Sequence, residues 1–277
     1  MDTIAASLML LAGALHATWH VMVKGASAPS LLVGMGLVSA LLACPFLFLV
    51  PCPLPSLWPI YVLSISLHVG YKLFLGLAYE RGELSKAYPL MRALVPICAT
   101  IVSFIESGLL PSTAQLVGIV LVSAGAFGLA IGGIRSDLGA RLSLLALAAS
   151  AMVAGYSIVD AHGARSPFGW LSFTTWLIFL DGVVFALVAR IIQGAALWSQ
   201  LNNLRGRTVV ASALGTASFA VYVWALSLSP LAVVATFREC GIVFAAFLGV
   251  FVLKERLRLT RLVAIGAIVA GVAMIAV

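Results

Sequence analysis

Several charged side chains stand inside long apolar stretches of this sequence, where a charge is costly. They are Lys72, Arg92, Asp181, Arg238 and Glu239. A charge at the centre of a bilayer costs on the order of 3 kcal/mol on insertion scales, so each of these residues is a candidate for function. The two arginines offer forked N–H donors, which predicts that they hold an anionic or zwitterionic molecule. In the alternative interpretation, each arginine pairs with Asp181 or Glu239 and only ties helices together.

Histidines close to these charges could transfer protons. His16 and His20 are four residues apart, and so are His68 and Lys72, so each pair shares one face of a helix. We expect His16, His20, His68 and Asp181 to take up and release a proton. Lys72 could exchange a proton as well, or could extend its ammonium group to the membrane surface. No metal site is expected, because His16 and His20 have no third ligand near them.

Aromatic side chains with polar tips accompany the charges. The rings of Trp and Tyr combine an apolar body with one hydrogen-bonding atom, which suits a binding pocket as well as a packed core. The side chains that we expect to bind a small molecule are Arg92, Arg238, Lys72, Glu239, Trp19, Tyr71, Tyr156 and Tyr222. Asp160 and His162 lie near the end of an apolar stretch, and we expect both to be solvated.

The composition places the elements that carry these residues in a membrane. Of the 277 residues, 63% are apolar and 9% are charged, whereas soluble proteins are near half apolar and a quarter charged. Apolar runs near the spanning length of about 20 residues recur along the chain, and each is predicted to be a helix because lipid offers no partner to an open backbone. The expected spans are roughly 3–23, 30–50, 57–78, 84–106, 113–132, 141–161, 168–190, 208–228, 230–252 and 259–277.

The chain also resembles itself. Sliding it by 146 residues pairs Arg92 with Arg238, and no gap is needed across 84–130. Apolar matches arise easily by chance, but an arginine deep inside a span is rare. We therefore expect two five-helix repeats, 1–132 and 141–277. Because five is odd, the second repeat enters the membrane from the opposite side, which predicts an all-α fold of about ten helices in two inverted repeats.

The basic residues are unevenly distributed over the gaps between spans. One set of gaps holds nearly all of them, and the other set holds only Arg165. This distribution predicts a multi-pass protein of the bacterial inner (plasma) membrane with both termini outside. The net charge of +7 therefore indicates no nucleic-acid partner, because the basic residues lie where inserted proteins place them. The start, Met1-Asp2-Thr3, has no basic region of the kind that opens a cleaved signal peptide.

Three segments resemble the EamA-type carriers of the drug/metabolite transporter superfamily. Trp19–Lys24 is similar to the end of that family's first helix, and residues 78–96, AYERGELSKAYPLMRALVP, resemble its third-to-fourth helix junction. Lys254-Glu255-Arg256-Leu257, followed by Ala264 and Gly271, is similar to the fourth-to-fifth helix signature of a repeat. The resemblance implies ten helices around a central cavity and the transport, often the export, of amino acids or other small metabolites. Characterised members commonly keep both termini in the cytoplasm, opposite to the orientation that the charges predict.

We therefore expect a secondary transporter, and not an enzyme, that exports a small anionic or zwitterionic metabolite such as an amino acid by alternating access. No cofactor is expected, because the sequence has no GxxxxGK[ST] motif for a nucleotide and no metal-ligand spacing among its cysteines. The alternatives are a membrane enzyme acting on lipid or a small metabolite through His16, His20 and Asp181, and a scaffold whose polar residues only lock helices. The expected partners are the substrate, the bilayer and a coupled proton; the sequence leaves a homodimer open.

Overall fold

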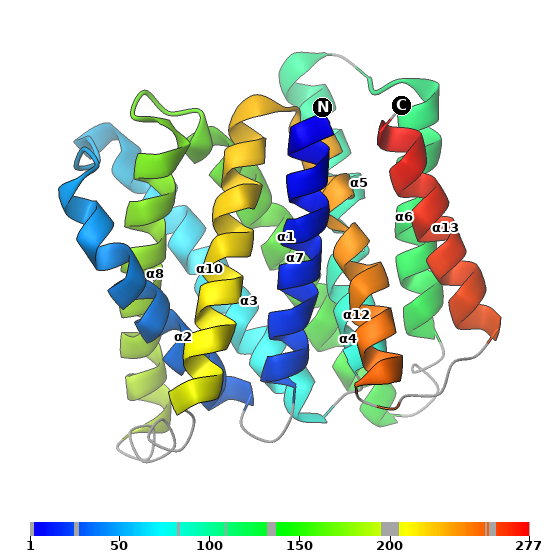
Figure 1. Ribbon diagram of the computed structural model, residues 1–277, viewed down its shortest axis with the longest axis horizontal. Coiled ribbons are helices and arrows are strands. Elements are labelled where there is room, and N and C mark those ends of the chain that lie inside the picture. The colour runs from blue at the N-terminus through cyan, green and yellow to red at the C-terminus, as the bar shows by residue number, and fades with distance from the viewer. Residues whose placement is uncertain are drawn as a thin grey trace.

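The protein is almost entirely helical in the part that the structure describes. This computed structural model describes residues 3–24, 28–81, 84–108, 110–131, 137–194, 205–252, 254 and 259–276 (Figure 1). No strand occurs within these residues. The α-helices are α1 (Thr3–Val23), α2 (Ala28–Ala43), α3 (Trp58–Arg81), α4 (Leu84–Arg92), α5 (Val95–Ser107), α6 (Thr113–Ile131), α7 (Asp137–Ala164), α8 (Gly169–Gln193), α10 (Arg205–Leu228), α11 (Leu231–Arg238), α12 (Cys240–Phe251) and α13 (Leu259–Ala276). Two 3-10 helices, Cys44–Phe48 and Pro55–Leu57, lie between α2 and α3.

The helices have the lengths and the composition of membrane spans. In the described residues, eight helical segments are long and apolar enough to cross a bilayer, and two shorter apolar helices, Thr113–Leu129 and Leu259–Ile275, lie in α6 and α13. The two chain ends lie at the same edge of the molecule (Figure 1). An even number of crossings returns the chain to the edge where it began. The prediction of an all-α integral membrane protein with about ten spanning segments is therefore confirmed.

Two of the expected spans are broken near their centres, so the prediction of one continuous helix for each was wrong. α4 ends at Arg92, and α5 begins three residues later at Val95. Pro96 has no N–H to donate to the carbonyl of Arg92, which ends the helical ladder there. The second break lies at Glu239 between α11 and α12 and needs no proline, because the Glu239 N–H turns back to the Thr236 carbonyl at 3.0 Å. Both breaks place helix ends inside the bundle.

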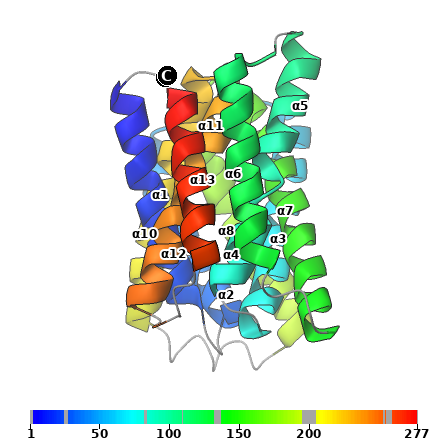
Figure 2. The same ribbon diagram turned by 90° about the vertical axis from the view of Figure 1, so that its right-hand side faces the viewer.

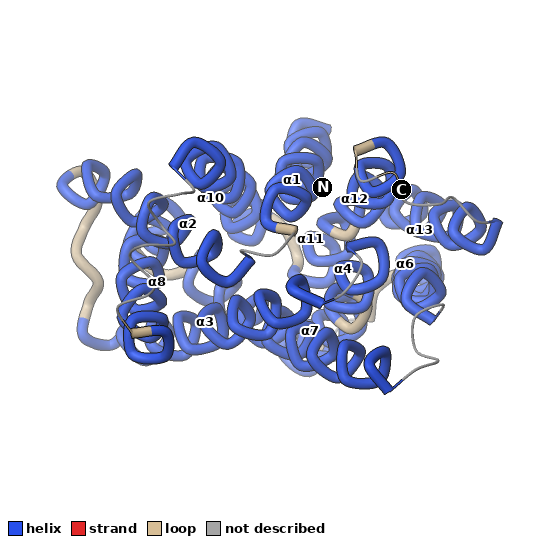
Figure 3. The backbone as a smooth tube through the Cα atoms, turned by 90° about the horizontal axis from the view of Figure 1, so that it is seen from below, coloured by secondary structure: helices blue, strands red, loops and turns tan. Residues whose placement is uncertain are grey.

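The arrangement of the helices follows an approximate two-fold relation. Seen along the helices, α2 and α8 lie at one end, α6 and α13 lie at the other, and α4 and α11 lie inside (Figure 3). The long sides are α1 packed on α10 and α3 packed on α7. Each of these pairs joins one helix before the middle of the chain to one after it. Matching the first five spans in order to the last five turns the α1–α10 pair into the α7–α3 pair, and it maps α2–α8 and α6–α13 onto themselves. Two inverted repeats are expected to pack in this way.

Glycine contacts between α6 and α13 support this relation at the level of residues. These two helices lie side by side (Figure 2). A Cβ added to Gly118 would lie 2.6 Å from the Gly271 carbonyl oxygen, and one added to Gly125 would lie 2.7 Å from that of Ala264. The 146-residue shift converts Gly118 into Ala264 and Gly125 into Gly271, so it exchanges the two contacts. The borders 1–132 and 141–277 themselves stay a prediction.

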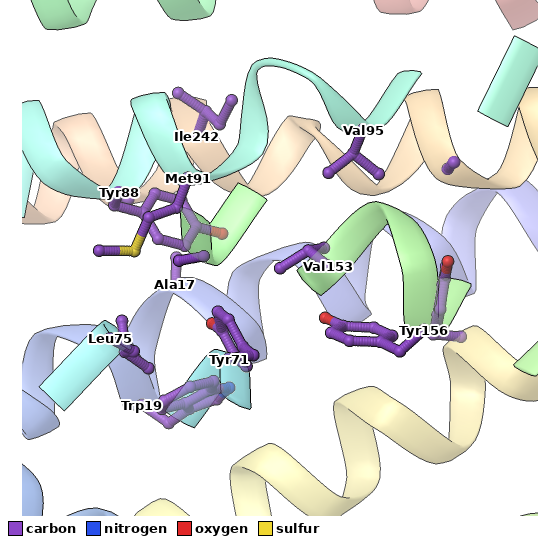
Figure 4. Packing of buried hydrophobic residues seen from close by; sticks show 14 of the residues in the cluster. Ala17, Trp19, Tyr71, Leu75, Tyr88, Met91, Val95, Val153, Tyr156 and Ile242 are labelled. Atoms are coloured by element: carbon purple, nitrogen blue, oxygen red, sulfur yellow. The ribbon is translucent and has the colours of Figure 1, made fainter. Parts of the chain in front are cut away.

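Aromatic rings fill the interior where the two halves meet. The side chains of Trp19, Tyr71, Tyr88 and Tyr156 are all buried, and they converge from α1, α3, α4 and α7 (Figure 4). Rings with polar tips can pack against apolar neighbours while presenting a hydrogen-bonding atom to a polar site. The polar tips of these rings can therefore form hydrogen bonds with charged groups in the interior.

Candidate functional site

A cavity of about 120 Å³ lies between helices of both halves. One water needs roughly 10–15 Å³ measured in the same way, so the cavity has room for a small molecule or several waters. Its wall combines apolar side chains, namely Leu32, Met35, Leu177, Ile178 and Phe219, with small residues and polar ones. The polar and aromatic lining residues are His16, Trp19, Ser39, His68, Tyr71, Lys72, Tyr156, Asp181, Thr216 and Arg238.

The structure brings most of the expected site residues to this one wall. Those that line the cavity are His16, Trp19, His68, Tyr71, Lys72, Tyr156, Asp181 and Arg238. The other expected residues, His20, Arg92, Tyr222 and Glu239, are buried behind the lining and contact members of it or each other. The sequence therefore predicted which residues gather around the cavity. Only the structure shows which of them line it and which are buried behind the lining.

Arg92 forms a two-bond ion pair with Glu239, as in the alternative interpretation, and its buried Nη1 has no hydrogen-bond partner among the described residues. Its Nη2 donates to Glu239 Oε1 at 2.8 Å, and its Nε donates to Oε2 at 3.1 Å. Both side chains are 1% exposed. Because Arg92 ends α4 and Glu239 lies between α11 and α12, this fork joins the two broken helices at their breaks.

Arg238 is the counterpart of Arg92 in the repeat, but within the described residues its guanidinium forms no ion pair with a carboxylate. It lies over the Tyr222 ring at 3.9 Å from the ring centre, and its buried Nε and Nη1 have no hydrogen-bond partner among the described residues. The two-fold relation explains the difference. The 146-residue shift that pairs the arginines also pairs Glu239 with Ala93, so the position equivalent to the carboxylate holds a methyl group. Arg238 therefore lines the cavity while two of its buried donors stay unpaired within the described residues.

Lys72 and Asp181 form a second ion pair, which connects α3 to α8 across the cavity wall. The Lys72 ammonium also lies 4.9 Å from the centre of the Phe185 ring. It therefore binds the interior carboxylate and does not extend to the membrane surface. Asp181 Oδ2 accepts from Lys72, whereas its buried Oδ1 has no hydrogen-bond partner in the described part of the chain. One carboxylate oxygen is left to accept another donor.

The two histidines of α1 belong to a chain of hydrogen bonds. Trp19 Nε1 donates to His16 Nδ1 at 3.1 Å, His16 Nε2 lies 3.1 Å from His20 Nε2, and His20 Nδ1 lies 2.7 Å from Tyr79 Oη. An indole N–H only donates, so His16 carries its proton on Nε2, and His20 accepts there and carries its own on Nδ1. No hydrogen bond links these histidines to Asp181, and no group of three potential metal ligands occurs among the described residues.

Asp160 is the polar residue that the sequence placed wrongly. It was expected to be solvated, but it is completely buried and accepts from Ser64 Oγ at 2.5 Å and lies 3.1 Å from His68 Nε2. The spacing of Ser64 and His68 puts them on one helix face, but only the packing of α3 against α7 brings Asp160 to that face. His162, in contrast, is exposed as expected and pairs with Glu106.

An all-α membrane bundle with two inverted halves around a cavity is a plan that many transporters share. The model of the EamA-like transporter family matches residues 141–277. The second half of the chain thus matches the EamA-like transporter family, the family that the sequence resembles.

Solved structures agree with this fold. A solved structure titled "Crystal structure of protein" is 20% identical, has a TM-score of 0.74, and the match covers 100% of this chain and 99% of that one. At this identity the likeness concerns the fold alone. No curated protein matches the sequence.

Proposed function

We propose that the protein is a secondary transporter that carries a small zwitterion, such as an amino acid, across the bacterial inner membrane by alternating access. The observation that supports this proposal best is the pair of unsatisfied charged groups at one cavity, namely the Arg238 donors and Asp181 Oδ1. Buried polar atoms are nearly always hydrogen-bonded in folded proteins. Unpaired atoms of opposite charge at the same cavity are therefore suited to a ligand that carries both charges.

The chemistry of the wall matches the two ends of an amino acid. A carboxylate would accept the free N–H groups of Arg238, and an ammonium group would donate to Asp181 Oδ1 beside Lys72. The apolar lining residues Leu177, Ile178 and Phe219 would contact an apolar side chain. The size of the cavity favours a small substrate.

The inverted halves supply the two states that a carrier needs. The Lys72–Asp181 pair joins α3 to α8, and the Arg92–Glu239 pair joins α4 to the break between α11 and α12. Both pairs cross between the halves, so movement of one half against the other would remodel the cavity.

The proposal is tested by binding to the purified protein. We would measure thermal stabilisation by each L-amino acid, by the matching amine without a carboxylate, and by the matching acid without an ammonium group. We expect stabilisation by amino acids only. Arg238→Gln should weaken binding about 30-fold or more, since losing a buried charged partner removes roughly 2–5 kcal/mol. Arg190→Gln, which changes an exposed arginine of α8, is the matched control.

Two results would contradict the proposal. One is amines or acids that stabilise the protein as well as the amino acids do. The other is an Arg238→Gln variant that binds the amino acid with unchanged affinity.

A further inference from the structure

A carboxylate–imidazole pair lies in the cavity region outside the groups assigned above to the substrate. Asp160 of α7 is fully buried, and His68 of α3 lines the cavity. In the described part of the chain, the hydrogen-bond partners of the Asp160 carboxylate are the Ser64 hydroxyl and the His68 imidazole. No Lys or Arg there pairs with it. The negative charge is thus compensated by one hydroxyl and one imidazole.

The hydrogen bonds define where a further proton would bind. An ionised carboxylate only accepts, so His68 Nε2 carries the hydrogen that is donated to Asp160 Oδ2. The described residues provide no hydrogen-bond partner for His68 Nδ1. When Nδ1 takes a proton from water in the cavity, the pair becomes an imidazolium–carboxylate pair, and its net charge changes from −1 to 0. Burial favours this neutral pair over an uncompensated charge.

Groups from the neighbouring elements connect this pair to the substrate site. The His68 ring stacks on the Tyr156 ring of α7 with 3.9 Å between centres, and the Arg238 guanidinium of α11 lies 6.0 Å from the centre of the same Tyr156 ring. On the other elements around the cavity, α8 brings Asp181 to Lys72 of α3, and α10 brings Phe219 to the His68 ring and Tyr222 to Arg238. The exposed pair Glu106–His162 joins α5 to the end of α7.

We infer that His68 and Asp160 form the proton-binding site of the carrier, and that its occupancy is coupled to substrate binding at Arg238. This inference rests on the proposed function and selects among the residues expected to exchange protons. His16 and His20 suit the role less well, because three of their four ring nitrogens bond to one another or to Tyr79 and the fourth accepts from Trp19. One proton enters from water at His68 Nδ1 and leaves to water when the cavity opens to the other side.

The sign of the coupling follows from the charges. A protonated His68 places a positive charge against the Tyr156 ring, which the Arg238 guanidinium also approaches. A bound substrate carboxylate would offset both of these positive charges. Protonation and substrate binding therefore favour each other. Because coupling between sites is commonly about fivefold or more, we expect amino-acid affinity to rise at least about fivefold when the pH falls from 8 to 6.

The test compares four proteins at pH 6 and pH 8. Wild type, His68→Gln, Asp160→Asn and His162→Gln are titrated with the L-amino acid that stabilises the wild type most. His162→Gln is the matched control, since it removes an exposed histidine that also pairs with a carboxylate. We expect wild type and His162→Gln to show the pH dependence, and His68→Gln and Asp160→Asn to bind without it. Retention of the full pH dependence in a folded His68→Gln variant would overturn the inference.

A second measurement needs no substrate and separates this inference from the proposed function. The protein has four histidines, so ¹⁵N-histidine spectra in nanodiscs can be assigned with His68→Gln and His162→Gln. We expect the His68 signals to show both a neutral and an imidazolium form in a pH titration of the wild type. A His68 ring that keeps one form throughout the titration would refute the proton site even if amino acids bind. Loss of amino-acid binding alone would instead refute the proposed function.

Discussion

At the scale of the residue, the two intramembrane arginines differ in what faces them. Arg92 donates to Glu239 through Nε and Nη2 and leaves Nη1 unpaired, whereas Arg238, whose equivalent partner position in the repeat is Ala93, leaves both Nε and Nη1 unpaired within the described residues. The duplicated sequence therefore carries one arginine that holds helices together and one that can bind a ligand. A change that affects Arg92 should therefore lower stability, whereas a change that affects Arg238 should lower ligand binding.

Replacing Arg92 should reduce stability. Arg92→Met leaves Glu239 buried without its partner, and breaking a buried pair in this way costs about 3–5 kcal/mol. The free energy of unfolding, measured while a denaturing detergent is titrated into a mild one, reports this loss. The double variant Arg92→Met/Glu239→Leu removes both charges and should recover most of it. A single variant as stable as the wild type would contradict the structural role.

Supplying the missing carboxylate should inactivate Arg238 without removing it. Ala93→Glu places an acid where the repeat relation puts the equivalent of Glu239, so we expect an ion pair with Arg238 and the loss of amino-acid binding. Ala93→Gln, with nearly the same shape and no charge, controls for the added volume. Titration by thermal shift gives the readout. Equal binding by Ala93→Glu and Ala93→Gln would show that the asymmetry has no functional role.

At the scale of the element, close helix contact depends on small residues. Gly118 and Gly271 bring α6 and α13 so close that a methyl group on Gly118 would overlap the Gly271 backbone. Without a hydrophobic force between helices in lipid, such close packing is a main source of association. The shorter apolar helices α6 and α13 therefore depend on their glycines.

An alanine scan of these glycines tests this dependence. Gly118→Ala should destabilise the protein by about 1–3 kcal/mol, as overpacking usually does. Gly266→Ala in α13 is the matched control, because a Cβ there meets nothing within 4 Å. Thermal unfolding of the two variants measures the difference. Equal melting temperatures would contradict the tight contact.

The sequence predicted the elements better than their contacts. Apolar length alone places the spans, because an unpaired backbone is excluded from lipid. The charged residues inside the spans, with the histidines and aromatic residues near them, predicted most of the polar residues that line the cavity. The partners could not be predicted, since the pairing of Lys72 with Asp181 and the burial of Asp160 depend on which helices pack together. The helix break at Glu239 was also hidden, because no proline marks it.

At the scale of the whole molecule, the inverted halves and the distribution of basic residues define an orientation. Lys24 follows the end of α1, and Arg190 lies in the last turn of α8, so both lie at the edge away from the chain ends, whereas Arg165 follows α7 at the other edge. Basic residues favour the cytoplasmic side. We therefore propose that both termini lie outside.

Labelling of introduced cysteines tests the orientation in a background without the native cysteines. A membrane-impermeant maleimide should label Arg165→Cys in intact spheroplasts and Arg190→Cys only after the membrane is permeabilised. The reverse pattern would place the termini in the cytoplasm, as is common among characterised relatives of this family.

The central claim, that unpaired charges at a cavity between two inverted halves hold a zwitterion during its passage, is tested most directly by exchange across proteoliposomes. Vesicles are loaded with an unlabelled amino acid that stabilises the protein, and entry of the labelled form is followed. We predict rapid exchange by the wild type and by Arg190→Gln, and none by Arg238→Gln despite normal folding. Exchange by Arg238→Gln at the wild-type rate would contradict the account.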